Sequence, residues 1–208
     1  MSLLLYYSPG TAALAVHILL EELGVSHRLE RVDFASGAQH GAAFRAVNPK
    51  GRVPALSTSD GILTETPAIL AYLCQTHPQA GLAPQDPFAL AQAQAFNVYL
   101  ASTVHVAHAH RPRAERWSDD PATYPAMHAK VPQNMNECMR YISDRYLDGE
   151  WVLGAKYSMC DAYLFTVARW LEGDGVALSD HPKIAAHLTA VQSRPAVQRA
   201  LEHHLPKP

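Results

Sequence analysis

The stretch VPALSTSDGILTETPAIL, residues 53–70, decides the fold that the sequence predicts. Two short apolar runs flank Asp60-Gly61, a dipeptide that favours a tight turn between antiparallel strands. Pro67 suits the first position of a helix, because the N–H that proline lacks is not needed there, and Thr66 before it is a good N-cap. The stretch therefore predicts a β-hairpin that leads directly into a helix.

The residues that precede this stretch alternate between strand-like and helix-like patterns. Leu3–Tyr7 is a short apolar run typical of a buried strand, and His27–Phe34 is a second strand candidate. Between them, Ala12–Leu23 has apolar residues around most of a helical surface, and Gly24 stands in the usual position after a helix. With a short helix expected in residues 35–46, the predicted order is β-α-β-α-β-β-α.

The rest of the chain has a different pattern. The stretch PQAGLAPQDP, residues 78–87, is rich in proline and typical of a linker, and the sequence after it is helical throughout. We therefore predict an α/β domain over 1–78, a linker over 79–87 and an all-helical domain over 88–208. The helices expected in the last part are Phe88–His110, Ala126–Leu147, one from Ser158 through Trp170, His181–Ser193 and Pro195–Leu201.

Composition excludes several classes of protein. The 208 residues are 48% hydrophobic with a formal net charge of −2, so the chain should fold and has no basic surplus for nucleic acid. No apolar run approaches the roughly 18–20 residues of a membrane helix, and we see no signal peptide. The three cysteines, Cys74, Cys138 and Cys160, form no C-x-x-C pair, which favours a reducing, cytoplasmic location.

Several motifs together resemble one family. NPKGRVPAL at 48–56, TETPAI at 64–69, YSMCDAYLF at 157–165 and RPAV at 194–197 resemble, in this order, motifs of the glutathione S-transferases. YSPG at 7–10 and the helix around His105 are most similar to the bacterial beta class. The resemblance implies a thioredoxin-like N-terminal domain followed by an all-α helical-bundle domain, and it implies a homodimer.

The resemblance also implies which residues bind glutathione, a tripeptide with an ammonium, two carboxylates and a thiol. It implies a cis bond at Val53-Pro54 that turns the Val53 backbone toward the extended peptide. Glu65 offers a carboxylate for the ammonium, and Thr66 offers a hydroxyl and helix N–H groups for a carboxylate. Thr103 would reach the glutathione of the partner subunit. Taken alone, Glu65 and Thr66 also fit an ordinary helix start.

The sequence departs from the beta class where the thiol is expected. The turn after the first strand usually reads SPGACS there, with a Cys that can form a mixed disulfide with glutathione, but here Ala12 and Ala13 take these positions. Val106 replaces an expected Lys, and the Lys expected soon after Asp33 is missing. Three groups that would approach or favour a thiolate are therefore absent.

The remaining candidates for activating the thiol are hydroxyls and an imidazole. Thr11 is the hydroxyl nearest to the helix start, and Tyr7 is the phenol at the strand end. We predict that both donate to the thiolate, with Ser8 a weaker candidate, although Tyr7 also fits a core position. His105, which matches the beta-class site histidine, could donate to the sulfur or to the second substrate.

Two histidine and acid patterns have simpler explanations. His105, His108 and His110 invite a metal site, but His110 lies off the helical face of the other two and no acidic partner is near in sequence, so we predict no metal. Ser158 and Asp161 form a capping box, which is structural. A basic cluster, Arg111, Arg113 and Arg116, fits either a solvated loop or the binding of an acidic substrate.

We therefore predict a cytoplasmic, homodimeric glutathione S-transferase, with no bound cofactor and glutathione as co-substrate. It would lower the thiol pKa and add the thiolate to a small hydrophobic electrophile. The alternative from another class is a non-catalytic binder of glutathione or an apolar ligand, because fold does not fix function. A regulatory protein that binds a macromolecule is a third possibility, and a dehalogenase or isomerase that uses glutathione is also compatible with the sequence.

Overall fold

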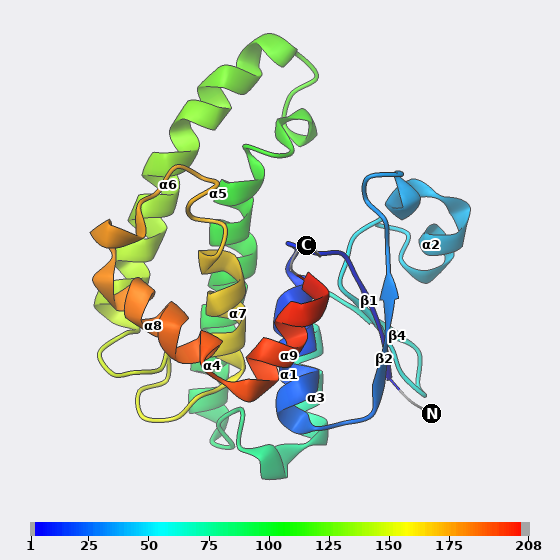
Figure 1. Ribbon diagram of the computed structural model, residues 1–208, viewed down its shortest axis with the longest axis vertical. Helices are drawn as coiled ribbons and strands as arrows, with labels where there is room; N and C mark the ends of the chain where they lie inside the picture. Colours follow the sequence, from blue (N-terminus) through cyan, green and yellow to red (C-terminus); the bar gives the residue numbers. More distant parts are fainter. Residues whose placement is uncertain (1–2, 205–208) are drawn as a thin grey trace.

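The computed structural model describes residues 3–204, which form a four-stranded sheet packed against a group of helices (Figure 1). The sheet contains β1 (Leu3–Tyr7), β2 (His27–Arg31), β3 (Ala55–Ser57) and β4 (Ile62–Thr64), in the spatial order β2-β1-β3-β4. Strand β1 pairs with β2 in parallel and with β3 antiparallel, and β3 pairs antiparallel with β4. This mixed sheet has the thioredoxin-like arrangement that the sequence predicted.

The hairpin forms where Asp60-Gly61 indicated. Thr58 donates its N–H to the carbonyl of Gly61 over 2.8 Å, and Gly61 has a φ of 136°, a conformation that glycine adopts without a steric penalty. Strand β3 begins at Ala55, two residues later than the apolar run suggested. Helix α3 (Thr66–Thr76) follows β4 after one residue, so its first turn lies at the end of the sheet.

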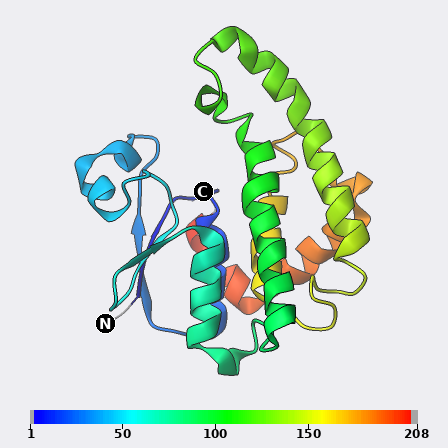
Figure 2. The same ribbon diagram turned by 180° about the vertical axis from the view of Figure 1, so that it is seen from behind.

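Helices cover the two faces of the sheet unequally. Helices α1 (Ala13–Leu23) and α3 lie between the sheet and the helical half, whereas the small helix α2 (Ala42–Val47) lies on the other side (Figures 1 and 2). The period of two along β1 explains the contacts, because Tyr6 meets Phe44 of α2 while Tyr7 faces the opposite way. Helix α1 is buried on nearly all sides over its first two turns, as its apolar pattern predicted, and ends at Gly24 with a φ of 62°.

All the regular elements described after residue 76 are helical. They are α4 (Pro87–Tyr99), α5 (His105–Ala109), α6 (Tyr124–Arg145), α7 (Met159–Ala168), α8 (Pro182–Gln192) and α9 (Pro195–His204), with short helical turns at Pro78–Ala80, Ala114–Arg116, Pro121–Thr123 and Leu178–Asp180. The last helix, α9, returns to pack on α1 of the first half (Figure 1). The boundaries predicted for the two domains and the linker remain a prediction.

One predicted helix is interrupted. Residues 88–110 were expected to form a single helix, but a π-helical segment, Leu100–Val104, separates α4 from α5. His105 donates its N–H to the carbonyl of Leu100, five residues back, so one extra residue is accommodated within a turn. Such insertions often occur next to functional sites. Here the segment ends immediately before His105.

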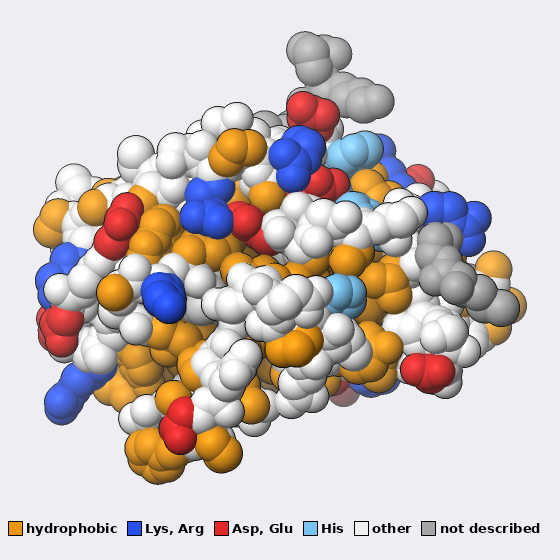
Figure 3. Space-filling model, turned by 90° about the horizontal axis from the view of Figure 1, so that it is seen from below, with side chains coloured by type: hydrophobic (Ala, Val, Ile, Leu, Met, Phe, Trp, Pro, Cys, Tyr) orange, Lys and Arg blue, Asp and Glu red, His pale blue; other side chains and the backbone are white. Residues whose placement is uncertain are grey.

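The surface has no large region of one charge on the face seen in Figure 3, where basic, acidic and hydrophobic side chains are mixed. None of the helices within residues 3–204 is both long and apolar enough to cross a membrane.

Candidate functional site

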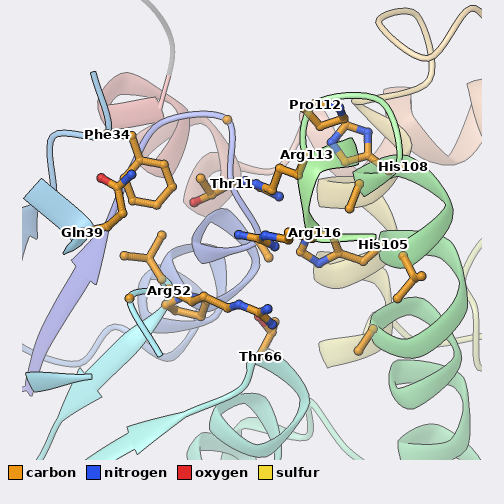
Figure 4. Close-up of a pocket in the computed structure, with 18 of the residues that line it drawn as sticks. Thr11, Phe34, Gln39, Arg52, Thr66, His105, His108, Pro112, Arg113 and Arg116 are labelled. Carbon is orange, nitrogen blue, oxygen red and sulfur yellow. The ribbon is translucent and has the colours of Figure 1, made fainter. Parts of the chain in front are cut away.

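A cavity lies between the sheet half and the helical half, where the predicted motifs meet (Figure 4). The turn before α1, the loop before β3 and the start of α3 form one side. Helix α5, the segment that follows it and the end of α7 form the other. The predicted residues that line it are Thr11, Val53, Pro54, Glu65, Thr66 and His105.

At one end of the cavity, helix α3 begins without a side-chain cap. The N-cap residue is Glu65 rather than the predicted Thr66, and its side chain makes no capping hydrogen bond. Thr66 is the first helical residue and is buried beside the cavity. The prediction failed because Glu65 has a φ of 70°, a left-handed conformation that sequence patterns do not indicate for glutamate. The N–H groups of the first turn therefore remain available to an anion.

Glu65 itself carries a carboxylate at the cavity wall. Its Oε1 accepts a hydrogen bond from Lys50, which also donates to the Thr64 hydroxyl over 2.8 Å. Val53 and Pro54 lie beside this group, and the peptide bond between them is cis. The Glu65 carboxylate and the N–H groups at the start of α3 thus lie beside the Val53-Pro54 backbone. This arrangement suits a ligand with an ammonium and a carboxylate on one carbon.

At the other end, the turn before α1 presents Thr11. Its hydroxyl donates to the carbonyl of Ser8 over 2.6 Å and accepts from the Ala13 N–H over 3.4 Å. Ala12 at the N-cap of α1 has no polar side chain that could cap the helix. Trp170, from the segment after α7, donates its indole N–H to the carbonyl of Gly10 over 3.0 Å and holds the turn against the helical half. The positive end of α1 therefore opens into the cavity.

Tyr7 is not brought to the cavity. It is buried, does not line the cavity, and its ring centre lies 4.9 Å from that of His204 and 6.5 Å from that of His17. The reason is the alternation along β1, which turns the side chain at position 7 under α1 and α9. The geometry supports the core position for Tyr7, whereas Thr11, the other hydroxyl predicted to activate the thiol, lines the cavity.

His105 lines the cavity from α5, with its ring centre 4.9 Å from that of Trp170. Burial, followed by the positive charge of Arg113, lowers the pKa of His105 to about 3. The imidazole is therefore neutral near pH 7 and carries one N–H that can donate. Thr103 is exposed and lies outside this cavity in the single chain, so its predicted role toward a partner subunit remains a prediction.

The neighbouring histidines have separate partners. His108 contacts both oxygens of Asp174 at 2.9 Å and stacks on Trp170. His110 contacts the carbonyl of Val106 at 2.7 Å. Sequence reasoning found no acidic partner, because Asp174 is 66 residues away in the chain. Within residues 3–204 these histidines do not converge as a group of metal ligands.

Three arginines give the cavity a positive charge. Arg52, Arg113 and Arg116 line it, and within the described residues none of their guanidinium groups forms an ion pair. Burial lowers the pKa of Arg113 and of Arg116, and the nearby arginines lower both further. In Figure 4 Arg113 reaches from the helical side toward Thr11. The third arginine of the predicted cluster, Arg111, instead donates to the carbonyl of Gly173.

The sequence did not single out Arg52, although it lies inside the NPKGRVPAL motif. It comes from the first half of the chain, and only the fold places it opposite Arg113 and Arg116. The capping box, in contrast, is structural as predicted: Ser158 and Asp161 satisfy the start of α7 and are buried.

Comparison with known proteins agrees with this geometry. Family models for the N-terminal domain of glutathione S-transferase match residues 1–75, and those for the C-terminal domain match residues 117–204. Glutathione S-transferase GstA of Escherichia coli O157:H7 is 35% identical to this chain over 201 residues. The match covers 95% of this chain and 96% of the GstA chain. The chain belongs to the glutathione S-transferase family of enzymes.

Two solved structures are similar over nearly their whole length. A glutathione transferase homologue from Sulfitobacter, solved with bound glutathione, is 44% identical with a TM-score of 0.94, and 97% of each chain is covered. A beta-class glutathione S-transferase from Sphingomonas chungbukensis is 30% identical with a TM-score of 0.84, over 96% of this chain and 97% of that one.

Proposed function

We propose that this protein binds glutathione in the cavity between its two halves, ionises the glutathione thiol, and transfers the thiolate to a small electrophile. In a substitution the sulfur forms a bond to an electrophilic carbon, the bond from that carbon to the leaving group breaks, and the leaving group departs with the electron pair. In an addition the electron pair of the carbon–carbon double bond instead takes a proton from solvent. In both cases the proton lost from the thiol passes to solvent. The observation that carries the proposal is that two helix starts, whose N-cap residues make no side-chain cap, meet in one cavity. The α3 start has a carboxylate beside it, and the α1 start has a hydroxyl and arginines.

Glutathione fits this arrangement end to end. The ammonium of its γ-glutamyl group would pair with Glu65, and the adjacent carboxylate would accept from the α3 N–H groups and the Thr66 hydroxyl. The Val53 backbone would pair with the cysteinyl residue of the extended peptide. The guanidinium of Arg52, which lines the cavity, would donate to the glycine carboxylate. The thiol would then lie near Thr11.

The thiol would be ionised without a protein cysteine. An unperturbed thiol has a pKa of about 8.5, and a helix N-terminus with nearby cations lowers it. A hydrogen bond to a charged group contributes about 1.5–3 kcal/mol, which corresponds to one to two pKa units. Helix α1, Thr11 and the charges of Arg113 and Arg116 would supply this stabilisation in place of the missing lysines. In these terms the chain is a beta-class-like enzyme that works without the usual Cys.

The second substrate would lie against the helical half. The apolar walls there come from Trp117 and Trp170, with Phe34 across the cavity on the sheet side (Figure 4), and neutral His105 can donate one hydrogen bond. These walls favour a small hydrophobic electrophile. Arg113 and Arg116 also favour an electrophile that carries an acidic group, because they line the same region unpaired. Rates for a neutral chloronitrobenzene and its carboxylate analogue would separate these two classes of electrophile.

A calorimetric titration of glutathione near pH 7, in two buffers of different ionisation enthalpy, tests the proposal. The difference in heat counts the protons released per site. We expect binding together with release of a substantial fraction of one proton. A variant with Glu65→Gln should bind more weakly by about tenfold or more, because it loses the charge that faces the ammonium.

Two outcomes would contradict the proposal. Binding without proton release would support the alternative, a non-catalytic binder of glutathione. A stable mixed disulfide between glutathione and a protein cysteine would mean that another thiol serves the site, although Cys74, Cys138 and Cys160 are all buried. The predicted homodimer and cytoplasmic location stay predictions.

A further inference from the structure

A second group of reactive side chains lies outside the cavity, where helix α1 meets β2. His17 and Glu21 are four residues apart on α1 and share one helical face, and His27 begins β2 after a connection of three residues. One atom of each of these side chains lies within 4.8 Å of the corresponding atoms of the other two. None of the three lines the candidate active-site cavity.

We propose that His17, Glu21 and His27 form a binding site for one divalent transition-metal ion, with Zn²⁺ as the expected ion. Glu21 Oε1 lies 3.7 Å from His17 Nε2 and 3.5 Å from His27 Nε2. Ligands at about 2.0–2.1 Å from a tetrahedral zinc ion are about 3.4 Å apart, so these two separations need only a small adjustment. Two imidazoles and a carboxylate are a donor set that zinc accepts.

His27 is already oriented as a metal ligand. Its Nδ1 lies 2.9 Å from the carbonyl of Val25, and a carbonyl can only accept, so Nδ1 carries the proton. Nε2 therefore keeps its lone pair, and this is the atom that faces Glu21. A backbone carbonyl that holds the distal nitrogen of a ligating histidine is a common feature of metal sites.

His17 is a buried side chain that forms no hydrogen bond with any residue between 3 and 204. It is 1% exposed, its Nδ1 has no partner within the described residues, and its Nε2 is too far from Glu21 for a hydrogen bond. A buried polar group without a partner calls for an explanation, and an ion is one.

The groups around the site define its other contacts. Arg199 of α9 donates from Nε to Glu21 Oε2 over 2.6 Å, which fixes the carboxylate and leaves Oε1 facing the histidines. This positive charge also weakens the attraction for a cation. His203, exposed near the end of α9, has its ring centre 5.5 Å from that of His17 and is the nearest source of a fourth ligand besides water. A bound ion would tie α1, β2 and α9 together.

Zinc titration of chelator-treated protein, made without a polyhistidine tag, tests the proposal. We expect one Zn²⁺ per chain by calorimetry, a higher melting temperature with zinc, and visible d–d absorption of a tetrahedral site when Co²⁺ is used instead. His27→Gln and Glu21→Gln should each weaken Zn²⁺ binding at least about tenfold. His27 is a better target than His17, because it is less buried and glutamine can still donate to Val25.

His128→Gln is the matched control, since His128 lies on α6, away from α1 in both ribbon views (Figures 1 and 2). It should bind zinc like the unchanged protein. The proposal is overturned if zinc neither binds stoichiometrically nor raises the melting temperature. It is also overturned if His27→Gln and Glu21→Gln, shown to be folded, bind zinc as tightly as the His128→Gln control. Neither result bears on glutathione binding, because the two sites share no residue.

Discussion

Asp161 and Arg113 are two charged side chains that this protein surrounds in opposite ways. Asp161 is fully buried, and its carboxylate accepts hydrogen bonds from the Val152 and Ser158 N–H groups at 2.8 Å and from the Ser158 hydroxyl at 2.9 Å. It also pairs with His187 Nε2 at 3.0 Å. Every part of this charge has a partner, so the group contributes to the fold and offers nothing to a ligand.

Arg113 has the opposite surroundings. It is half-buried at the cavity, and its burial, followed by the nearby positive charge of Arg52, lowers its pKa. Within the described residues no carboxylate pairs with it. Unpaired, mutually repelling charges at a cavity cost stability, and such charges are more common where they bind a ligand. We infer that the state of pairing, more than burial, separates charges that support the fold from charges that could bind a ligand in this protein.

The largest expected effect is a loss of stability when the buried Asp161 carboxylate is removed. Asp161→Ala leaves His187 and three donors without a partner in the core, and we expect a loss of about 3–5 kcal/mol in the free energy of unfolding. Urea denaturation followed by circular dichroism measures this loss. Asp180→Ala, at an exposed acid, should change stability by no more than about 0.5 kcal/mol. A similarly small loss for Asp161→Ala would mean that the paired Asp161 carboxylate does not stabilise the fold, and that pairing does not distinguish it from Arg113.

Arg113→Gln should lower activity without lowering the stability of the fold. We expect kcat/KM for glutathione to fall about 10- to 100-fold, because a charge-assisted contact worth about 1.5–3 kcal/mol is lost. The free energy of unfolding should stay the same or rise, since one unpaired charge is removed. Arg145→Gln, at an exposed position on α6, is the control and should keep full activity. If Arg113→Gln destabilised the fold and left the kinetics intact, Arg113 would belong with Asp161.

Stability should also fall in mild acid because of buried histidines without partners. His204 is 5% exposed, and neither of its ring nitrogens has a hydrogen-bond partner among residues 3–204. Burial and the nearby His17 lower its pKa to about 3. The unfolded chain binds a proton near pH 6.5 and the folded chain does not. The contribution of His204 to the free energy of unfolding is therefore fully present above about pH 6.5 and is lost as the pH falls toward 3.

At pH 5 the expected contribution of this one histidine is a loss of about 1–2 kcal/mol relative to pH 7. Urea unfolding at both pH values, with a chelator present, measures it. His204→Gln should lose less stability between the two pH values than the unchanged protein does. An equal loss in both proteins would mean that His204 finds a partner or solvent in solution.

The sequence predicted the fold well because the information was local. The Asp60-Gly61 turn, Gly24 after α1 and the capping box at Ser158 each use residues a few positions apart. The π-helical segment before His105 was missed, since no residue pattern distinguishes it from a regular helix. The N-cap at Glu65 was missed because a left-handed glutamate depends on the surrounding structure.

The site was only partly predictable because it combines distant parts of the chain. The motif residues Val53, Glu65 and Thr66 were identified and do line one cavity. Arg52 beside Arg113, and Asp174 beside His108, are pairs that only the folded chain creates. Tyr7 illustrates the remaining ambiguity, since a residue at the end of a strand can point to either face.

The smallest effects concern the two hydroxyls that the sequence placed together at the site. Thr11→Val keeps the shape of the side chain and removes the hydroxyl, and we expect the proton release on glutathione binding and kcat/KM to fall about 3- to 10-fold. The effect should be smaller than that of Arg113→Gln, because the Thr11 hydroxyl already donates to the Ser8 carbonyl and must be shared with a thiolate.

Tyr7→Phe should change neither quantity by more than about twofold, because the phenol lies under α1 and α9 and does not line the cavity. The two variants are compared in the same two-buffer calorimetric titration and in steady-state kinetics at several pH values. If Tyr7→Phe lowered proton release as much as Thr11→Val does, the phenol would have to reach the sulfur by a rearrangement of β1. In that case Tyr7 would belong with the residues that act on the ligand, as Arg113 is proposed to do, and not with buried structural residues such as Asp161.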